Sequence, residues 1–204
     1  MKKIILTVAA VFAFGFANAQ ETTEAKGFGF SKGNIMVEGN LGFSSTNDKN
    51  TEVKTNSFEF NPKAGYFVTD KFAVGIQLGI GSDKEETAGT DTDKNSNFDA
   101  GVFGRYYFLD LGQRFKTYAE AGVNFQNGKA GLADAKYSGV GVGAGLGINY
   151  FVSESFAINF GLTDVLSYST KKWDGGKAVS EFNGNVNVFN NFFSTAQFGL
   201  TYKF

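Results

Sequence analysis

Eight charged residues, placed on the polar faces of the predicted strands, determine what chemistry the interior of this chain can carry. They are four acids and four bases, and this balance predicts a neutral network of ion pairs, because buried charge must be paired. Carboxylates also serve general acid–base catalysis, and Glu38 and Glu59 would form such a pair if they faced each other across a hairpin. Lys63 lies nearby, so a structural ion pair is favoured over a catalytic one. The predicted interior network is Glu38, Glu59, Lys63, Asp99, Arg105, Lys116, Glu120 and Lys203.

Other signals for catalysis or metal binding are weak. The chain has no His, which removes the commonest general base and the commonest transition-metal ligand, and it has no Cys. Residues 91–95 resemble the start of a calcium loop, but Ser96 stands where that loop needs Gly and Val102 where it needs Glu. A Ser/Lys or paired-carboxylate mechanism remains formally open. We predict no enzyme activity and no catalytic, cofactor-binding or metal site.

The elements that position these residues are stretches of alternating apolar and polar residues. In the last of them, Phe198, Leu200, Tyr202 and Phe204 share one face, while polar residues and glycine share the other. A period of two predicts strands, and helical periodicity explains none of these stretches. The eight predicted strands cover residues 35–43, 58–66, 72–81, 98–108, 115–126, 140–150, 156–163 and 192–204.

The connections between these strands alternate in length. Three short ones alternate with four longer polar ones, which are expected to be loops. A barrel threaded through an outer membrane sorts its connections this way, with short turns inside and longer loops outside, whereas a soluble sandwich has no reason to. The short connections are 69–71, 109–114 and 153–155, and the long ones are 46–56, 83–96, 128–138 and 171–191.

The apolar faces are expected to meet lipid. Aromatic residues gather at both ends of the strands, as in the two interfacial belts of a membrane protein. Asp164 is the charged exception on the apolar face. We therefore predict an all-β fold, an eight-stranded antiparallel up-and-down transmembrane β-barrel, whose polar face lines a narrow lumen.

The N-terminus has the pattern of an export signal. Lys2 and Lys3 precede an apolar run, and small residues lead up to a cleavage site after Ala19. The predicted organisation is a signal peptide at 1–19, a short periplasmic segment at 20–32 and an outer-membrane barrel at 33–204. The formal net charge of −1 gives nothing to attract nucleic acid.

The chain ends at Tyr202-Lys203-Phe204, after a strand with apolar residues at alternate positions. Here it resembles the family of small bacterial outer-membrane β-barrel proteins of the OmpX, OmpW and OmpA-barrel type. The resemblance covers the mature chain as an architecture and implies a Gram-negative cell envelope. It also implies that Phe198, Leu200, Tyr202 and Phe204 form a C-terminal signal read by the outer-membrane assembly machinery.

Three functions are compatible with this sequence. The first is a structural or surface-interaction barrel, with its lumen plugged by paired charges and its outer loops contacting surface ligands. The second is a narrow porin-like channel for small or apolar solutes, and the third is a soluble secreted barrel that binds a ligand. Trp173, beside a turn signal at 174–176, is either an exposed anchor for a surface ligand or a packing residue against a neighbouring loop. Paired charges in an eight-stranded interior favour the first function.

Overall fold

Alternation of apolar and polar residues produces an all-β fold. The computed structural model describes residues 27–184 and 197–204. Within these two ranges, no helix is long and apolar enough to cross a membrane. The strands are β1 (Ile35–Asp48), β2 (Val53–Phe67), β3 (Phe72–Thr87), β4 (Thr90–Leu111), β5 (Phe115–Ala130), β6 (Ala135–Phe151), β7 (Phe156–Trp173), β8 (Ala178–Gly184) and β9 (Gln197–Lys203).

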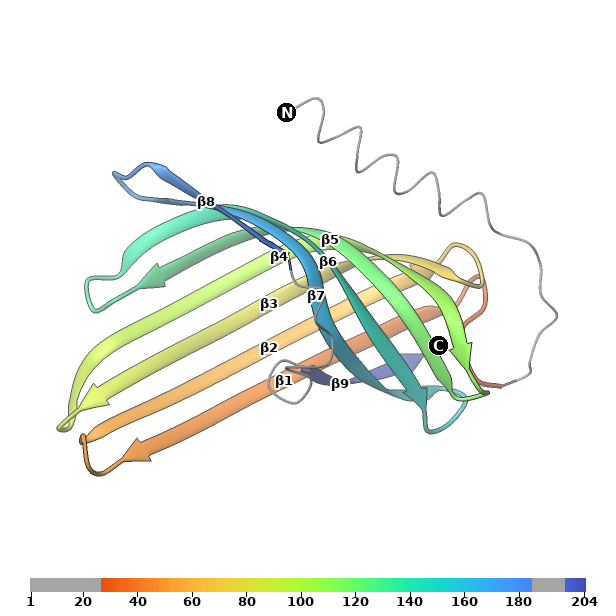
Figure 1. Cartoon of the computed structure of the whole chain (residues 1–204), viewed down its shortest axis with the longest axis horizontal. Helices are drawn as coiled ribbons and strands as arrows, with labels where there is room; N and C mark the ends of the chain where they lie inside the picture. The colour runs from red at the N-terminus through yellow and green to blue at the C-terminus, as the bar shows by residue number, and fades with distance from the viewer. Residues whose placement is uncertain (1–26, 185–196) are drawn as a thin grey trace.

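The strands close into a barrel (Figure 1). Consecutive strands from β1 to β7 pair antiparallel, and β9 closes the ring by pairing with both β7 and β1. β8 continues the same edge of β7, because it pairs with residues 166–172 whereas β9 pairs with residues 156–161. The predicted eight-stranded antiparallel barrel is confirmed. The signal peptide at 1–19 and the first part of the predicted last strand, 192–196, lie outside the described residues.

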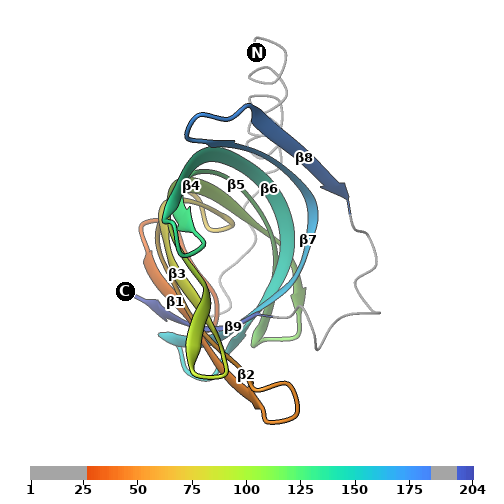
Figure 2. The ribbon, with the colours of Figure 1, turned by 90° about the vertical axis from the view of Figure 1, so that its left-hand side faces the viewer.

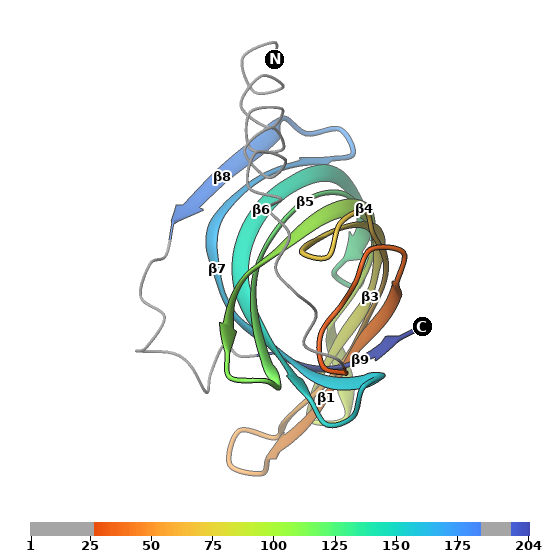
Figure 3. The same cartoon turned by 90° about the vertical axis from the view of Figure 1, so that its right-hand side faces the viewer.

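The two ends of the barrel carry different connections. At one end, which we call the short-turn end, the connections are 68–71, 112–114 and 152–155. At the other, which we call the hairpin end, long paired strands meet in turns at 49–52, 88–89, 131–134 and 174–177. Figure 2 views the barrel from the hairpin end and Figure 3 from the short-turn end.

Within the described residues the long polar connections are mostly strands rather than loops, so that part of the prediction is wrong. β3 and β4 stay paired as far as Thr87 and Thr90, and only Ala88 and Gly89 turn the chain. Both of these residues have positive φ, 51° and 78°, which matches the twist of a two-residue hairpin turn. Backbone pairing does not need an apolar face, so the hairpins continue past the point where the apolar alternation ends.

The apolar face points out of the barrel, as predicted. Large apolar residues along this face are exposed, among them Leu41, Ile76, Phe125 and Leu200. Two register shifts lie between β6 and β7 near Asp164, whose backbone pairs with Gly145.

Candidate functional site

An ion-pair cluster crosses the lumen at Arg105. Its guanidinium donates to both oxygens of Glu38, over 2.8 Å each, and its Nε donates to Glu120 Oε2 over 2.7 Å. The Nζ of Lys63 contacts the other oxygen of Glu120. The pairing register explains part of this geometry, since Arg105 is the cross-strand partner of Glu120 and Glu38 that of Lys63. Arg105 then reaches across the barrel from β4 to β1 and joins the two pairs.

Neutral side chains extend this cluster to the other strands. The Thr201 hydroxyl donates to Glu38 over 2.9 Å, and the Asn149 amide donates to Thr201 over 3.0 Å. The Tyr107 hydroxyl in turn donates to the Asn149 carbonyl oxygen over 2.8 Å. Arg105 is fully buried, and its guanidinium carbon lies 4.0 Å from the centre of the Tyr118 ring. Charges this deeply buried are tolerated because their partners and hydrogen bonds are complete.

An aromatic layer lies between this cluster and the short-turn end. Phe30, which precedes β1, stacks on Phe67 with ring centres 4.3 Å apart. Its ring also lies 5.1 Å from that of Tyr107 and 5.2 Å from that of Phe151. Phe67 and Phe151 are fully buried, so this layer is closely packed.

The segment that carries Phe30 is fixed to the barrel by hydrogen bonds. Lys203 donates through Nζ to the Gly29 carbonyl over 2.8 Å. The backbone N–H of Lys32 donates to Asp70 over 2.7 Å, and that of Gly33 to the Phe67 carbonyl over 2.9 Å. Sequence reasoning missed Phe30 because it lies before the first alternating stretch. Two phenylalanines separated by glycine, Phe28 and Phe30, were the available signal.

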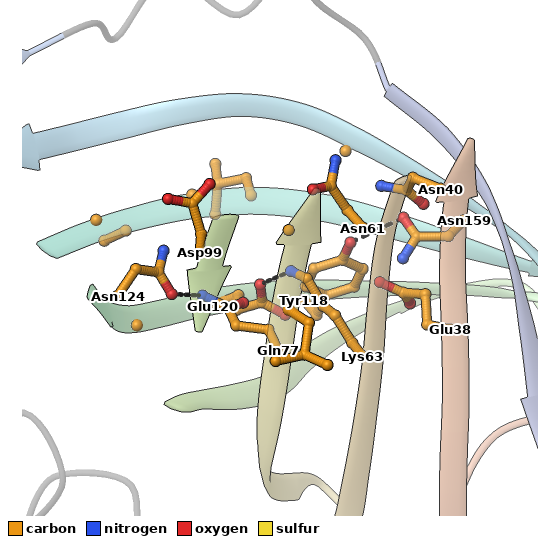
Figure 4. A pocket seen from close by; sticks show the side chains of 18 residues that line it. Glu38, Asn40, Asn61, Lys63, Gln77, Asp99, Tyr118, Glu120, Asn124 and Asn159 are labelled. Atoms are coloured by element: carbon orange, nitrogen blue, oxygen red, sulfur yellow. Dashed lines mark hydrogen bonds and ion pairs between the residues drawn. The ribbon is translucent and has the colours of Figure 1, made fainter. Parts of the chain in front are cut away.

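The hairpin half of the lumen is open by comparison. A cavity of about 480 Å³ lies on the other side of the ion pairs, and polar side chains from several strands point into it (Figure 4). Lys63 and Glu120 form its base and keep 19% and 16% of their side-chain surface exposed. Its other labelled lining residues are Glu38, Asn40, Asn61, Gln77, Asp99, Tyr118, Asn124 and Asn159.

The other predicted network residues lie apart from the central cluster. Lys116 pairs with Asp110 over 2.8 Å, and Lys203 bonds to the N-terminal segment. Asp99 accepts a hydrogen bond of 3.0 Å from Asn97. Glu59 does not face Glu38: it lies opposite Gly42 and accepts a hydrogen bond of 2.6 Å from Asn61. The structure therefore joins only Glu38, Lys63, Arg105 and Glu120 of the predicted eight into one ion-pair cluster.

The two remaining predicted sites lie on other surfaces. Phe198, Leu200, Tyr202 and Phe204 are exposed on the outer face of the last strand. Trp173 ends β7 at the hairpin end, and its ring centre lies 5.0 Å from that of Tyr137 on β6. Among residues 27–184 and 197–204, no three His, Cys, Asp or Glu side chains gather where they could hold a metal ion.

Known proteins share this architecture. OprG of Pseudomonas aeruginosa matches with a TM-score of 0.50 and 14% identity, over 86% of this chain and 98% of that one. The Neisserial surface protein NspA matches with a TM-score of 0.47 and 16% identity, over 86% and 99%. A search of curated proteins found no match. The family model for the outer membrane protein beta-barrel domain matches residues 6–204, and the chain belongs to that family.

Proposed function

We propose that this protein is a non-conducting outer-membrane barrel that acts at the cell surface through its hairpin end. In this proposal, signal peptidase removes residues 1–19, and the assembly machinery reads the strand that ends at Phe204. Residues 20–32 and the short turns then lie in the periplasm, and the hairpins project outward, as short and long connections do in such barrels. The protein has no enzymatic role.

The observation that carries the proposal is the double closure of the lumen. The ion pairs of Arg105 bridge β4 to β1 and β5, and the ring of Phe30 fills the space nearer the short-turn end. An eight-stranded barrel has an interior that side chains can fill, so we expect two successive layers to block the passage of a solute. This favours a structural or surface-interaction role over a narrow channel.

The hairpin end offers charged surfaces of opposite sign for contact with envelope components, other cells or host molecules. The β3–β4 hairpin is rich in acids, and within it the hydrogen bonds that Lys84 makes to Glu86 and Asp91, over 2.8 Å and 2.9 Å, raise the pKa of Lys84. The β5–β6 and β7–β8 hairpins carry Lys129, Lys136, Lys171, Lys172 and Lys177.

Single-channel conductance of the protein in a planar bilayer tests this proposal. The protein would be purified from the outer membrane of an expressing Gram-negative host, and its folding checked by heat-modifiable gel migration. The expected result is folded, inserted protein that gives no current steps. Steady small steps would contradict the proposal and favour a narrow channel, and a protein that never partitions into detergent would favour a soluble ligand-binding barrel.

A further inference from the structure

Amide side chains are prominent among the polar residues that line the cavity in the hairpin half of the lumen. Five of them, Asn40, Asn61, Gln77, Asn124 and Asn159, come from five different strands and surround the same space (Figure 4). An amide offers two N–H donors and one oxygen acceptor, so a set of them matches a ligand whose groups both donate and accept. Hydroxyl groups have this property.

Much of this hydrogen-bonding capacity is not used within the protein. Gln77 donates to the Asn124 oxygen, and Asn61 donates one hydrogen bond to Glu59. The Asn159 oxygen accepts a hydrogen bond of 2.9 Å from Tyr118, and the Asn40 oxygen is buried, so the amides with groups free for a ligand are those of Asn61, Gln77 and Asn124. Amide groups held in place by only one internal bond can still bind a polar ligand.

Charge in and beneath the cavity disfavours an anion. Three carboxylates, those of Glu38, Asp99 and Glu120, face two cations, Lys63 and the Arg105 that lies below them. Both cations are already paired with Glu38 or Glu120, which leaves Asp99 without an ion-pair partner among the described residues. A phosphate or carboxylate in the cavity would therefore meet Asp99, and Lys171, a cation that attracts the Asp99 carboxylate, is not among the residues that line the cavity.

The size of the cavity fits a small ligand. A volume of about 480 Å³ lies within the range of small-molecule sites, roughly 300–1,000 Å³. The ion pairs lie at its base, and the exposed surface of Lys63 and Glu120 shows that water reaches it.

We propose that this cavity binds a neutral sugar, of mono- or disaccharide size, from outside the cell. The hydroxyl groups of the sugar would bond to the amides of Asn61, Gln77 and Asn124, above the ion pairs. A free sugar and the end unit of a glycan chain share this chemistry. The inference rests on the proposed function, because in a conducting barrel the same groups would line a passage.

The test is isothermal titration of the purified protein with a panel of neutral sugars: glucose, galactose, mannose, N-acetylglucosamine, maltose and lactose. We expect at least one to bind with a dissociation constant of about 1 mM or tighter, and glucose 6-phosphate to bind at least about tenfold more weakly than glucose. Absence of binding by every neutral sugar would overturn the proposal. The sugar that binds would then be compared with a polysaccharide that carries it at its chain ends. Equal affinity for the two would identify the end of a glycan chain as the ligand, and binding of the free sugar alone would identify a free sugar.

Two matched substitutions of glycine by phenylalanine locate the site. A Cβ on Gly143, which lines the cavity, would meet nothing nearer than the Leu166 carbonyl at 3.7 Å, and one on Gly39, on the outer face, would meet only Phe60 at 3.8 Å. We expect Gly143→Phe to weaken sugar binding at least about tenfold and Gly39→Phe to leave it unchanged. Equal affinity in both variants would overturn the proposed site.

A third variant keeps the proposal testable if Gly143→Phe fails to fold. Gln77→Ala enlarges the cavity and removes two polar groups, so sugar binding should weaken about threefold or more. Unchanged affinity in folded Gln77→Ala would count against the amides as the binding groups. Conductance measured on the same preparation separates the two proposals. Current steps would contradict the closed lumen. If there are no current steps and no heat of sugar binding, only the proposal of sugar binding is contradicted.

Discussion

The two halves of the lumen are built from the same strands but are filled in opposite ways. In the half nearer the short-turn end, Arg105, Phe67 and Phe151 are fully buried. The ring of Phe30, from the segment before β1, packs against Phe67 and Phe151. In the hairpin half, the same strands carry amides and glycines, and a cavity remains. Strands β1 to β7 run through both halves, so the size of their inward side chains decides in large part where this barrel is closed.

Of the substitutions considered, removal of the Arg105 side chain should cause the largest loss of stability. Arg105→Ala leaves Glu38 buried without its partner, and breaking a buried ion pair in this way costs about 3–5 kcal/mol. We expect a lower midpoint in denaturant unfolding and the appearance of current steps. Arg114→Ala is the matched control, because Arg114 lies exposed at a short turn and donates only to backbone carbonyls. Unchanged stability and conductance in Arg105→Ala would mean that the ion pairs do not close the lumen.

A smaller loss of stability is expected when the aromatic layer is disturbed. Phe30→Ala removes the ring that stacks on Phe67, and since Phe30 is half-buried the loss should be about 2 kcal/mol. Conductance should stay silent, because the ion pairs of Arg105 remain. Phe28→Ala is the control, since the Phe28 ring lies against the exposed Arg114 rather than in the lumen. If the two variants unfold at the same denaturant concentration, Phe30 does not stabilise the closed half.

The smallest effect on stability should come from the hairpin half. Gln77→Ala breaks the hydrogen bond to Asn124, but water can enter the cavity and replace it, so the change should be under about 1 kcal/mol. Thermal unfolding followed by gel migration would measure it. A loss as large as that of Arg105→Ala would mean that the two halves are equally tightly packed.

The strands and their faces were predictable from the sequence, and the closure was predictable only in part. Alternation placed Ile76 and Leu200 on the outer face, and both are exposed there, because side chains with a period of two alternate between the two faces of a strand. The pairing of Arg105 with Glu120 follows from a register that hairpin partners can approximate. Its contact with Glu38, 67 positions away in the chain, depends on the width of the barrel, which no local pattern contains.

Two other features were not predictable for different physical reasons. The polar hairpins were expected to be loops because their side chains no longer alternate in hydrophobicity, yet backbone pairing continues through β3 and β4. Ala88 and Gly89 turn the chain without the Asn-Gly or Asp-Gly pair that usually marks such a turn. The role of Phe30 depends on a segment folding back into the barrel, a tertiary contact with no periodic signal.

Thiol labelling of two single-cysteine variants tests the difference between the halves most directly, because the chain has no cysteine of its own. Asn124→Cys places the thiol in the cavity, and Ala73→Cys places it in the fully buried layer with Phe67. In intact cells treated with a membrane-impermeant maleimide, Asn124→Cys should be labelled, and Ala73→Cys should react only after unfolding. Labelling of Ala73→Cys at the same rate as Asn124→Cys would contradict a lumen closed at one half and open to the outside at the other.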